Sequence, residues 1–128
     1  MLHAVAVLDD SSEFQQLVQA MLNYIGIHEV TALISSEQAL PTLLETPPDL
    51  LMLDVMMAGI GGLDVWSRLR AAPETQQLPI ILCTAAINSL VEDELRLEQD
   101  PYTQMLPKPF TLDELKQAIA ALIPHWNA

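Results

Sequence analysis

Short apolar runs alternate with amphipathic segments along the whole chain. Runs such as Leu50–Leu53 and Ile80–Cys83 contain no charged residue, and continuous apolar runs suit strands buried on both faces of a parallel sheet. Between the runs, apolar residues recur at helical spacing. The predicted strands are Ala4–Leu8, Glu29–Leu33, Leu50–Asp54, Ile80–Thr84 and Thr103–Leu106. The predicted helices are Ser12–Ile25, Ser36–Glu45, Gly62–Ala71, Ser89–Leu97 and Thr111–Ile123.

This alternation determines the predicted fold class. Strand and helix alternate along the chain, so we expect an α/β fold in which helices cover both faces of a five-stranded parallel sheet through right-handed crossovers. The length of 128 residues fits one domain, and a chain of this size buries roughly two-thirds of its surface on folding. Because 51% of the residues are apolar, disorder is not expected.

The helix ends carry capping signals. Ser12 and Gln15 resemble a capping box, with Ser12 as the N-cap of the first helix, and Gly26 is expected to stop that helix. The last helix has the clearest start, because Thr111 and Glu114 form a capping box. Its expected hydrophobic staple is Phe110 with Leu115, and its buried stripe is Leu115, Ile119, Leu122 and Ile123.

The first two helices have predicted core faces. The core face of the first helix comprises Phe14, Leu17, Val18, Met21, Leu22 and Ile25. That of the second comprises Leu40, Leu43 and Leu44. If Ser36 is the N-cap of the second helix, Pro41 lies beyond the first turn and removes one backbone hydrogen bond. We therefore expect this helix to be kinked or to start late.

Polar residues follow the buried strands at their carboxyl ends. Asp9-Asp10, Asp54 and Thr84 end three strands, and Lys108 follows a fourth, shorter one. The carboxyl edge of an open α/β sheet is where ligands bind. Two carboxylates ~5 Å apart repel by about 3 kcal/mol at an effective dielectric near 20, and a Mg²⁺ ion with its octahedral oxygen shell would offset that repulsion. Taken singly, the acids could simply begin a helix, the threonine could end a strand, and the lysine could face solvent. Their joint placement at four strand ends favours a site for a phosphoryl group.

Charge and composition narrow the function further. The net charge is −12, with 5 Lys+Arg against 17 Asp+Glu, which argues against nucleic acid or an anionic membrane as a direct partner and favours metal ions and basic protein surfaces. The 3 histidines are far apart in the sequence and are expected at the surface. Cys83, the 1 cysteine, lies in an apolar run and is expected to be a buried, inert thiol in a reducing cytosol. We see no secretory signal and no apolar run near the ~20 residues that cross a bilayer, so a cytoplasmic location is expected.

The ordered set of strand-end residues resembles the receiver domain of response regulators, the CheY-like family of two-component signalling. The matching residues are Asp9-Asp10, Asp54 within Leu53–Met57, Thr84-Ala85 and Lys108-Pro109-Phe110. The resemblance spans about residues 3–123. It implies a flavodoxin-like (βα)5 fold with strand order 2-1-3-4-5.

The resemblance also implies a role for each residue of the set. Asp54 would be the phosphoacceptor; Asp10, Asp54 and the backbone carbonyl of Met56 would bind Mg²⁺, with Asp9 assisting through water. Thr84 would hydrogen-bond the acyl phosphate, and Lys108 would pair with another of its oxygens. The peptide bond between Lys108 and the following proline would be cis.

In the implied mechanism, Asp54 attacks the phosphohistidine of a sensor histidine kinase or a histidine phosphotransfer protein. The charges of Mg²⁺ and Lys108 stabilise the transition state. The site later directs water at the phosphate, and phosphorylation shifts a two-state equilibrium in which Thr84 is drawn toward the new phosphate. The output would be contact between an unknown downstream protein and the face formed by the fourth helix, fifth strand and fifth helix.

Three departures from the family pattern affect these expectations. Ala58 and Gly61 replace the usual Pro and Asp after the phosphoacceptor, which suggests a looser loop. Met105 replaces the aromatic residue of the activation switch, and Tyr102 could substitute for it, although a surface or packing role is the simpler interpretation. Residues 99–101 replace the usual Ala-Gly turn before the fifth strand.

We therefore expect residues 1–128 to form one receiver domain with no effector domain, acting by protein contact or phosphorelay. An excised receiver from a longer protein is the alternative for its origin. A constitutive interaction module, a receiver fold whose output does not depend on phosphorylation, is the alternative function. A haloacid-dehalogenase-type phosphatase would need an Asp-x-Asp after the first strand, and a flavodoxin-type cofactor site would need a phosphate loop there; the sequence has neither.

Overall fold

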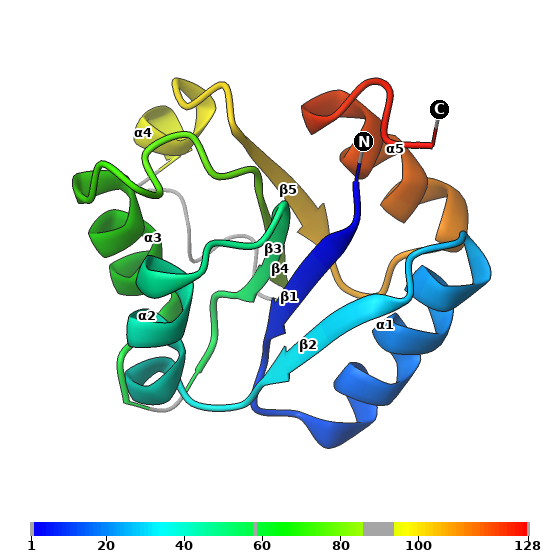
Figure 1. Cartoon of the computed structure of the whole chain (residues 1–128), viewed down its shortest axis with the longest axis horizontal. Helices are drawn as coiled ribbons and strands as arrows, with labels where there is room; N and C mark the ends of the chain where they lie inside the picture. The colour runs from blue at the N-terminus through cyan, green and yellow to red at the C-terminus, as the bar shows by residue number, and fades with distance from the viewer. Residues whose placement is uncertain (1, 58, 86–93, 128) are drawn as a thin grey trace.

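Five parallel strands form one sheet in the order β2-β1-β3-β4-β5 (Figure 1). The computed structural model describes residues 2–57, 59–85 and 94–127. The elements are β1 (Ala4–Leu8), α1 (Ser12–Tyr24), β2 (Glu29–Leu33), α2 (Ser36–Glu45), β3 (Leu50–Asp54), α3 (Gly62–Ala71), β4 (Ile80–Thr84), α4 (Glu94–Glu98), β5 (Thr103–Pro107) and α5 (Leu112–Leu122). The predicted fold class and strand order are confirmed.

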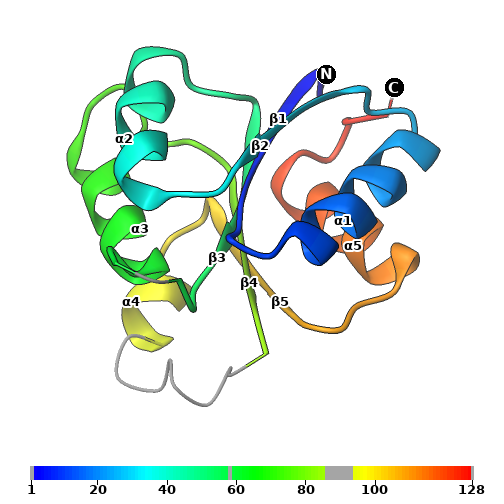
Figure 2. The same ribbon diagram turned by 90° about the horizontal axis from the view of Figure 1, so that it is seen from below.

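Helices cover both faces of the sheet. Figure 2 shows α1 and α5 on one face and α2, α3 and α4 on the other. The central strands β3 and β4 are buried along their whole length, because their alternating side chains enter two separate cores. Leu51 and Leu53 pack in the core shared with α2 and α3, whereas Leu50 and Met52 pack in the core shared with α1 and α5. This explains why the strands read as continuous apolar runs rather than as alternating ones.

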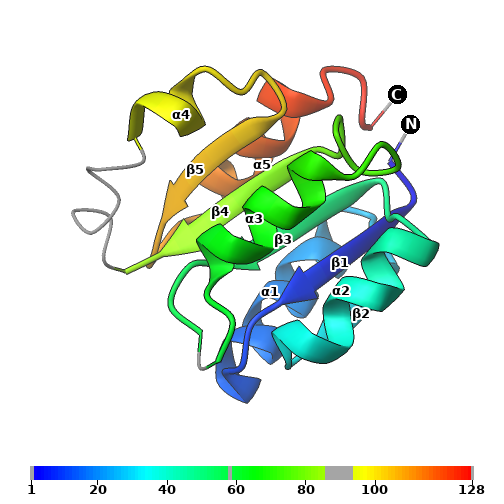
Figure 3. The same cartoon turned by 90° about the vertical axis from the view of Figure 1, so that its left-hand side faces the viewer.

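The strand register brings the carboxyl ends together at one edge of the sheet. Leu8 pairs with Leu53, so Asp9 and Asp54, which follow these two residues, lie at the carboxyl ends of adjacent strands. Thr84 at the end of β4 pairs with Pro107 at the end of β5, so Lys108, the next residue, lies at the same edge of the sheet. Figure 3 shows the arrows of β1, β4 and β5 running in the same direction, towards this edge.

The start of α1 differs from the predicted capping box. The N-cap is Ser11 rather than Ser12, and its side chain accepts a hydrogen bond from the Phe14 amide. Gln15 is buried against the sheet and does not reach back to the cap, because its amide group serves carbonyls at the ends of β1 and β2. The core stripe is also narrower than predicted, since Leu17 is 58% exposed. Gly26 ends the helix as expected, with a φ of 97°.

The other helices largely follow the predicted bounds. α2 begins at Ser36 with Ser35 as its N-cap, so the predicted late start is wrong, and Pro41 lies inside the helix with its side chain exposed. The predicted capping box of α5, Thr111 with Glu114, is confirmed. Part of the predicted fourth helix, residues 89–93, lies outside the described residues. None of the helices in the described part of the chain has the length and apolar character to cross a membrane.

Candidate functional site

Asp9, the first residue after β1, is held by the backbone around it. Its carboxylate accepts a hydrogen bond from the Ser11 amide at 2.8 Å, and its own amide donates to the Leu33 carbonyl at 3.0 Å. The Gln15 side chain donates to the Asp9 carbonyl at 3.0 Å. Only 1% of Asp9 is exposed, so this acid is fixed in the floor of the sheet edge.

Asp54, the last residue of β3, lies in a similarly enclosed position. Its Oδ1 accepts a hydrogen bond from the Met56 amide at 3.2 Å. Gly62, at the start of α3, packs directly under its backbone: a Cβ atom at Gly62 would lie 2.2 Å from the Asp54 carbonyl oxygen. Burial, followed by the negative charge of Asp9, raises the pKa of Asp54, and the positive charge of Lys108 opposes that rise in part.

Three acids meet at this edge. Asp9, Asp10 and Asp54 each offer a carboxylate oxygen, and these oxygens all lie within 4.8 Å of one another. Asp10 is exposed, so the cluster opens to solvent on one side. A set of hard carboxylate oxygens with access for water fits the coordination that Mg²⁺ requires. Met56, whose carbonyl was expected to contribute, contacts the same cluster through its amide.

Lys108 brings the positive charge to the cluster. Its Nζ lies 2.6 Å from Asp9 Oδ2 and 3.7 Å from Asp54 Oδ1. Its amide donates to the Thr84 carbonyl at 2.9 Å, which continues the pairing of β4 with β5, and Thr84 is only 1% exposed. The Lys108–Pro109 peptide bond is cis, as expected. The structure therefore brings the predicted strand-end residues to one edge.

Two residues at the site were not predicted to be there. The ring of Phe14 lies beneath the ammonium group, with its centroid 3.8 Å from Lys108 Nζ. Gln15 ties the ends of β1 and β2 together through the carbonyls of Val7, Asp9 and Leu33. The sequence signal for both was their place in the first turn of the helix after Asp9-Asp10. Helical spacing alone, however, indicated that Phe14 was a core residue and that Gln15 was part of a cap.

The loop after Asp54 is anchored to the start of α2. The buried Ser36 hydroxyl donates to the Ile60 carbonyl at 2.8 Å. Gly59 adopts a φ of 77° close to the Glu37 side chain, and Gly61 is the N-cap of α3. The expected looseness concerned Ala58 and Gly61; Ala58 lies outside the described residues, and contacts with α2 hold the described part of the loop.

The structure also places the residues of the altered switch. Met105 is half-buried in β5 and packs against the core under α2 and α3. Tyr102 is 37% exposed and precedes β5, so it lies at the end of the strand opposite Lys108, in keeping with a surface role. In the turn before it, Asp100 pairs with Arg70 at 2.5 Å and accepts a hydrogen bond from the Tyr102 amide.

Other expectations concern residues outside the site. Cys83 is buried, and its burial raises the pKa of the thiol to about 12, as expected for an inert side chain. His3, His28 and His125 are all exposed.

Comparisons with known proteins agree with this arrangement. The family described as "Response regulator receiver domain" matches residues 5–120. The phosphate regulon transcriptional regulatory protein PhoB of Rhizobium meliloti (strain 1021) is 33% identical over 123 residues, which are 96% of this chain and 53% of that protein. The probable transcriptional regulatory protein TcrX of Mycobacterium tuberculosis is 33% identical over 119 residues, 93% of this chain and 49% of that protein. The chain thus spans about half the length of these curated relatives.

Solved structures show the same fold. The receiver domain of the sensor histidine kinase PA1611 from Pseudomonas aeruginosa PAO1 superposes with a TM-score of 0.83 at 25% identity, covering 97% of this chain and 99% of that one. That structure has a magnesium ion coordinated in its active-site cleft. The chemotaxis protein CheY4 of Vibrio cholerae superposes with a TM-score of 0.81 at 23% identity, covering 95% of this chain and 99% of that one.

Proposed function

This chain belongs to the response regulator receiver domain family, and we propose that residues 1–128 form one receiver domain in which Asp54 accepts a phosphoryl group. The observation that carries the proposal is the position of the Lys108 ammonium group. It lies between Asp9 and Asp54, beside a cluster of three acids. A lone cation among carboxylates at the carboxyl edge of a parallel sheet suits the recognition of a phosphoryl oxygen.

The acids have separate roles in this proposal. Asp10, Asp54 and the Met56 carbonyl would hold a Mg²⁺ ion, and Asp9 would assist through water. When bound, the ion supplies positive charge that offsets the repulsion among the carboxylates and the charge on the transferring phosphoryl group. The fit rests on the carboxylate oxygens within 4.8 Å of one another and on the exposure of Asp10. The magnesium ion of the PA1611 receiver domain supports the same choice of metal.

The remaining chemistry belongs to the side chains. An oxygen of Asp54 attacks the phosphorus of a phosphohistidine in line, forming an O–P bond as the N–P bond breaks and the imidazole leaves. Lys108 pairs with one phosphoryl oxygen, and the Thr84 hydroxyl donates a hydrogen bond to another. Apart from the acyl phosphate formed on Asp54, the protein contributes positioning and electrostatic stabilisation. Water later attacks the phosphorus of the acyl phosphate, the bond between Asp54 and phosphorus breaks, and inorganic phosphate leaves, which returns Asp54 to its carboxylate form.

The proposed partners follow from this cycle. The phosphodonor is a sensor histidine kinase or a histidine phosphotransfer protein, and the output is contact with a downstream protein through α4, β5 and α5. Arg96 of α4 lies over the Trp66 ring of α3, 5.1 Å from its centroid, so a movement of α4 would alter this contact. Because position 105 is a methionine packed against the core, the output does not use the rotation of an aromatic ring there.

The test is phosphorylation with a small phosphodonor. In the presence of Mg²⁺ and acetyl phosphate, we expect the intact mass to increase by one phosphoryl group, mapped to Asp54 by peptide analysis. Asp54→Asn should abolish the gain, and Lys108→Ala should slow it by about 100- to 1,000-fold, the scale of losing one charge-stabilising group. Glu29→Gln, which removes an exposed acid from the edge strand β2, is the matched control and should react normally.

The same experiment separates the constitutive module from the phosphoacceptor. If the wild-type chain gains no mass with acetyl phosphate and shows no spectral change with beryllofluoride and Mg²⁺, the phosphoacceptor proposal fails. That result would favour a receiver fold whose contacts do not depend on phosphorylation.

A further inference from the structure

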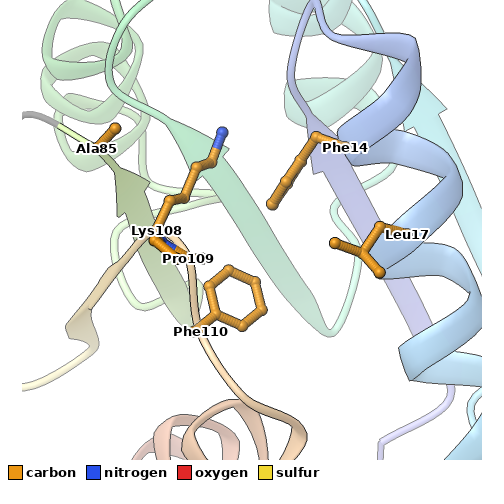
Figure 4. Close-up of a pocket in the computed structure, with 6 residues that line it drawn as sticks. All are labelled: Phe14, Leu17, Ala85, Lys108, Pro109 and Phe110. Atoms are coloured by element: carbon orange, nitrogen blue, oxygen red, sulfur yellow. The ribbon is translucent and has the colours of Figure 1, made fainter.

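We propose that Phe14 is a positioning residue that holds the Lys108 ammonium group within reach of Asp54 during phosphoryl transfer. The inference rests on the proposed function. Its starting point is the 3.8 Å distance from Lys108 Nζ to the centroid of the Phe14 ring. Figure 4 shows the two side chains lining one pocket, Phe14 from α1 and Lys108 from the segment after β5.

The contacts of Lys108 explain why such a residue is needed. The hydrogen-bond acceptor of its ammonium group is Asp9 Oδ2 at 2.6 Å, whereas Asp54 Oδ1 lies 3.7 Å away, too far for a hydrogen bond. Asp9 also belongs to the acid cluster proposed to serve a divalent cation. A cation in that cluster competes with the lysine for the carboxylate and repels the ammonium group. The acceptor that restrains Lys108 is therefore weakened in the state that carries out the transfer.

The Phe14 ring is not subject to that competition. An aromatic face attracts an ammonium group through its quadrupole, and it is no ligand for a hard metal ion such as Mg²⁺, which takes oxygen atoms. The ring restrains the ammonium group laterally without supplying a charge. Lys108 can therefore exchange Asp9 for a phosphoryl oxygen while it stays against the ring.

The fold fixes Phe14 in place. Its amide donates to the Ser11 side chain at the start of α1, and the adjacent Gln15 is anchored to the ends of β1 and β2. Its ring packs edge-on against Phe110, with centroids 6.0 Å apart and an interplanar angle of 79°. A side chain held at both backbone and ring by rigid elements can position another group.

The first test compares rates of phosphorylation by acetyl phosphate at saturating Mg²⁺, with no kinase present. Phe14→Leu keeps an apolar side chain but removes the aromatic face, and we expect the rate to fall by about threefold to thirtyfold, the range for a partly desolvated cation over a ring. Replacing Phe14 with mono-, di- and trifluorinated phenylalanine should lower the rate in graded steps, because fluorine withdraws charge from the ring face. Leu17→Ala trims the same pocket without touching the ammonium group and should leave the rate unchanged.

A second readout does not depend on phosphorylation. The Phe14 ring should shift the NMR signals of the Lys108 ε-CH2 protons upfield, and the shift should persist when Mg²⁺ is added. Phe14→Leu should abolish that shift while leaving the Mg²⁺ affinity within about twofold of wild type. A flat fluorinated series, or an ε-CH2 signal without an upfield shift in the Mg²⁺-loaded protein, would overturn the inference alone. A wild-type chain that accepts no phosphoryl group would overturn the proposed function and the inference with it.

Discussion

At the scale of single residues, Asp54 is placed where its charge destabilises the fold. Burial and the neighbouring Asp9 raise its pKa above the value in the unfolded chain. The folded protein therefore binds this proton more readily than the unfolded chain, and stability contributed by Asp54 is present below the unfolded pKa and is lost as pH rises through the folded pKa. An ionised Asp54 in the metal-free protein lowers the free energy of unfolding.

Removal of that charge should stabilise the metal-free protein. We expect Asp54→Asn to raise the free energy of unfolding by about 1 kcal/mol at pH 7, or roughly 4 °C in Tm for a domain of this size. The gain should shrink as the pH falls below about 3.9, the ordinary pKa of an aspartate, because the wild-type carboxyl then takes up a proton in both the folded and the unfolded chain. Thermal unfolding in a chelating buffer at pH 7 and in acid measures this, with Glu29→Gln as the exposed control on β2. A lower Tm for Asp54→Asn at pH 7, or a gain that persists in acid, would contradict the explanation.

At the scale of elements, the start of α1 shows how contacts with the sheet decide which serine caps the helix. Ser12 and Gln15 have the spacing of a capping box, but the side-chain amide of Gln15 donates to carbonyls at the ends of β1 and β2 instead. The amide of Ser11 donates to Asp9, and its hydroxyl caps the helix. Ser11 therefore contacts the acid site through its amide and caps α1 through its hydroxyl.

The two serines make a matched pair of substitutions. Ser11→Ala should cost about 1 kcal/mol of unfolding free energy, the usual effect of losing an N-cap side chain. Ser12→Ala should change it by less than ~0.5 kcal/mol, because no cap depends on that exposed side chain. Urea unfolding of both variants measures the difference. Equal effects, or a larger loss for Ser12→Ala, would restore the sequence-based capping box.

At the scale of the whole molecule, the acid cluster joins strands that are distant in the sequence. Asp9 follows β1 and Asp54 ends β3, so a ligand that binds both contacts the centre of the sheet. The opposite end of the sheet is secured separately: Arg70 of α3 pairs with Asp100 and lies 5.8 Å from the centroid of the Trp66 ring. These contacts of Arg70 do not involve the acid cluster.

Mg²⁺ should stabilise the folded chain as a whole. A ligand present at 100 times its Kd and bound only by the native state adds about 2.7 kcal/mol to the free energy of unfolding. We expect Mg²⁺ to raise Tm in a concentration-dependent way, and chelation to reverse the increase. Scanning calorimetry, with NaCl at matched ionic strength as the control, distinguishes binding from screening. Asp10→Asn should weaken the effect, and an equal Tm increase in that variant would place the ion elsewhere.

The sequence alone determined the order of strands and helices, most of their bounds and the set of strand-end residues. Leu50–Leu53 and Ile80–Cys83 are apolar throughout because both faces of their strands are buried, and that pattern is local. Asp9, Asp54 and Lys108 could be placed at one edge because parallel strands end on the same side. None of these conclusions requires knowledge of a tertiary contact.

The tertiary structure decided which polar and aromatic groups meet. Ser11 rather than Ser12 caps α1 because Gln15 is needed at the sheet, and Leu17 faces solvent although its spacing matches the core stripe. The contact of Phe14 with Lys108 joins residues from opposite ends of the chain. Such pairings depend on the direction in which side chains point after packing, so they could be learned only from the folded molecule. The hydrophobic period of a strand or helix is a property of its own residues, so it could be predicted from the sequence.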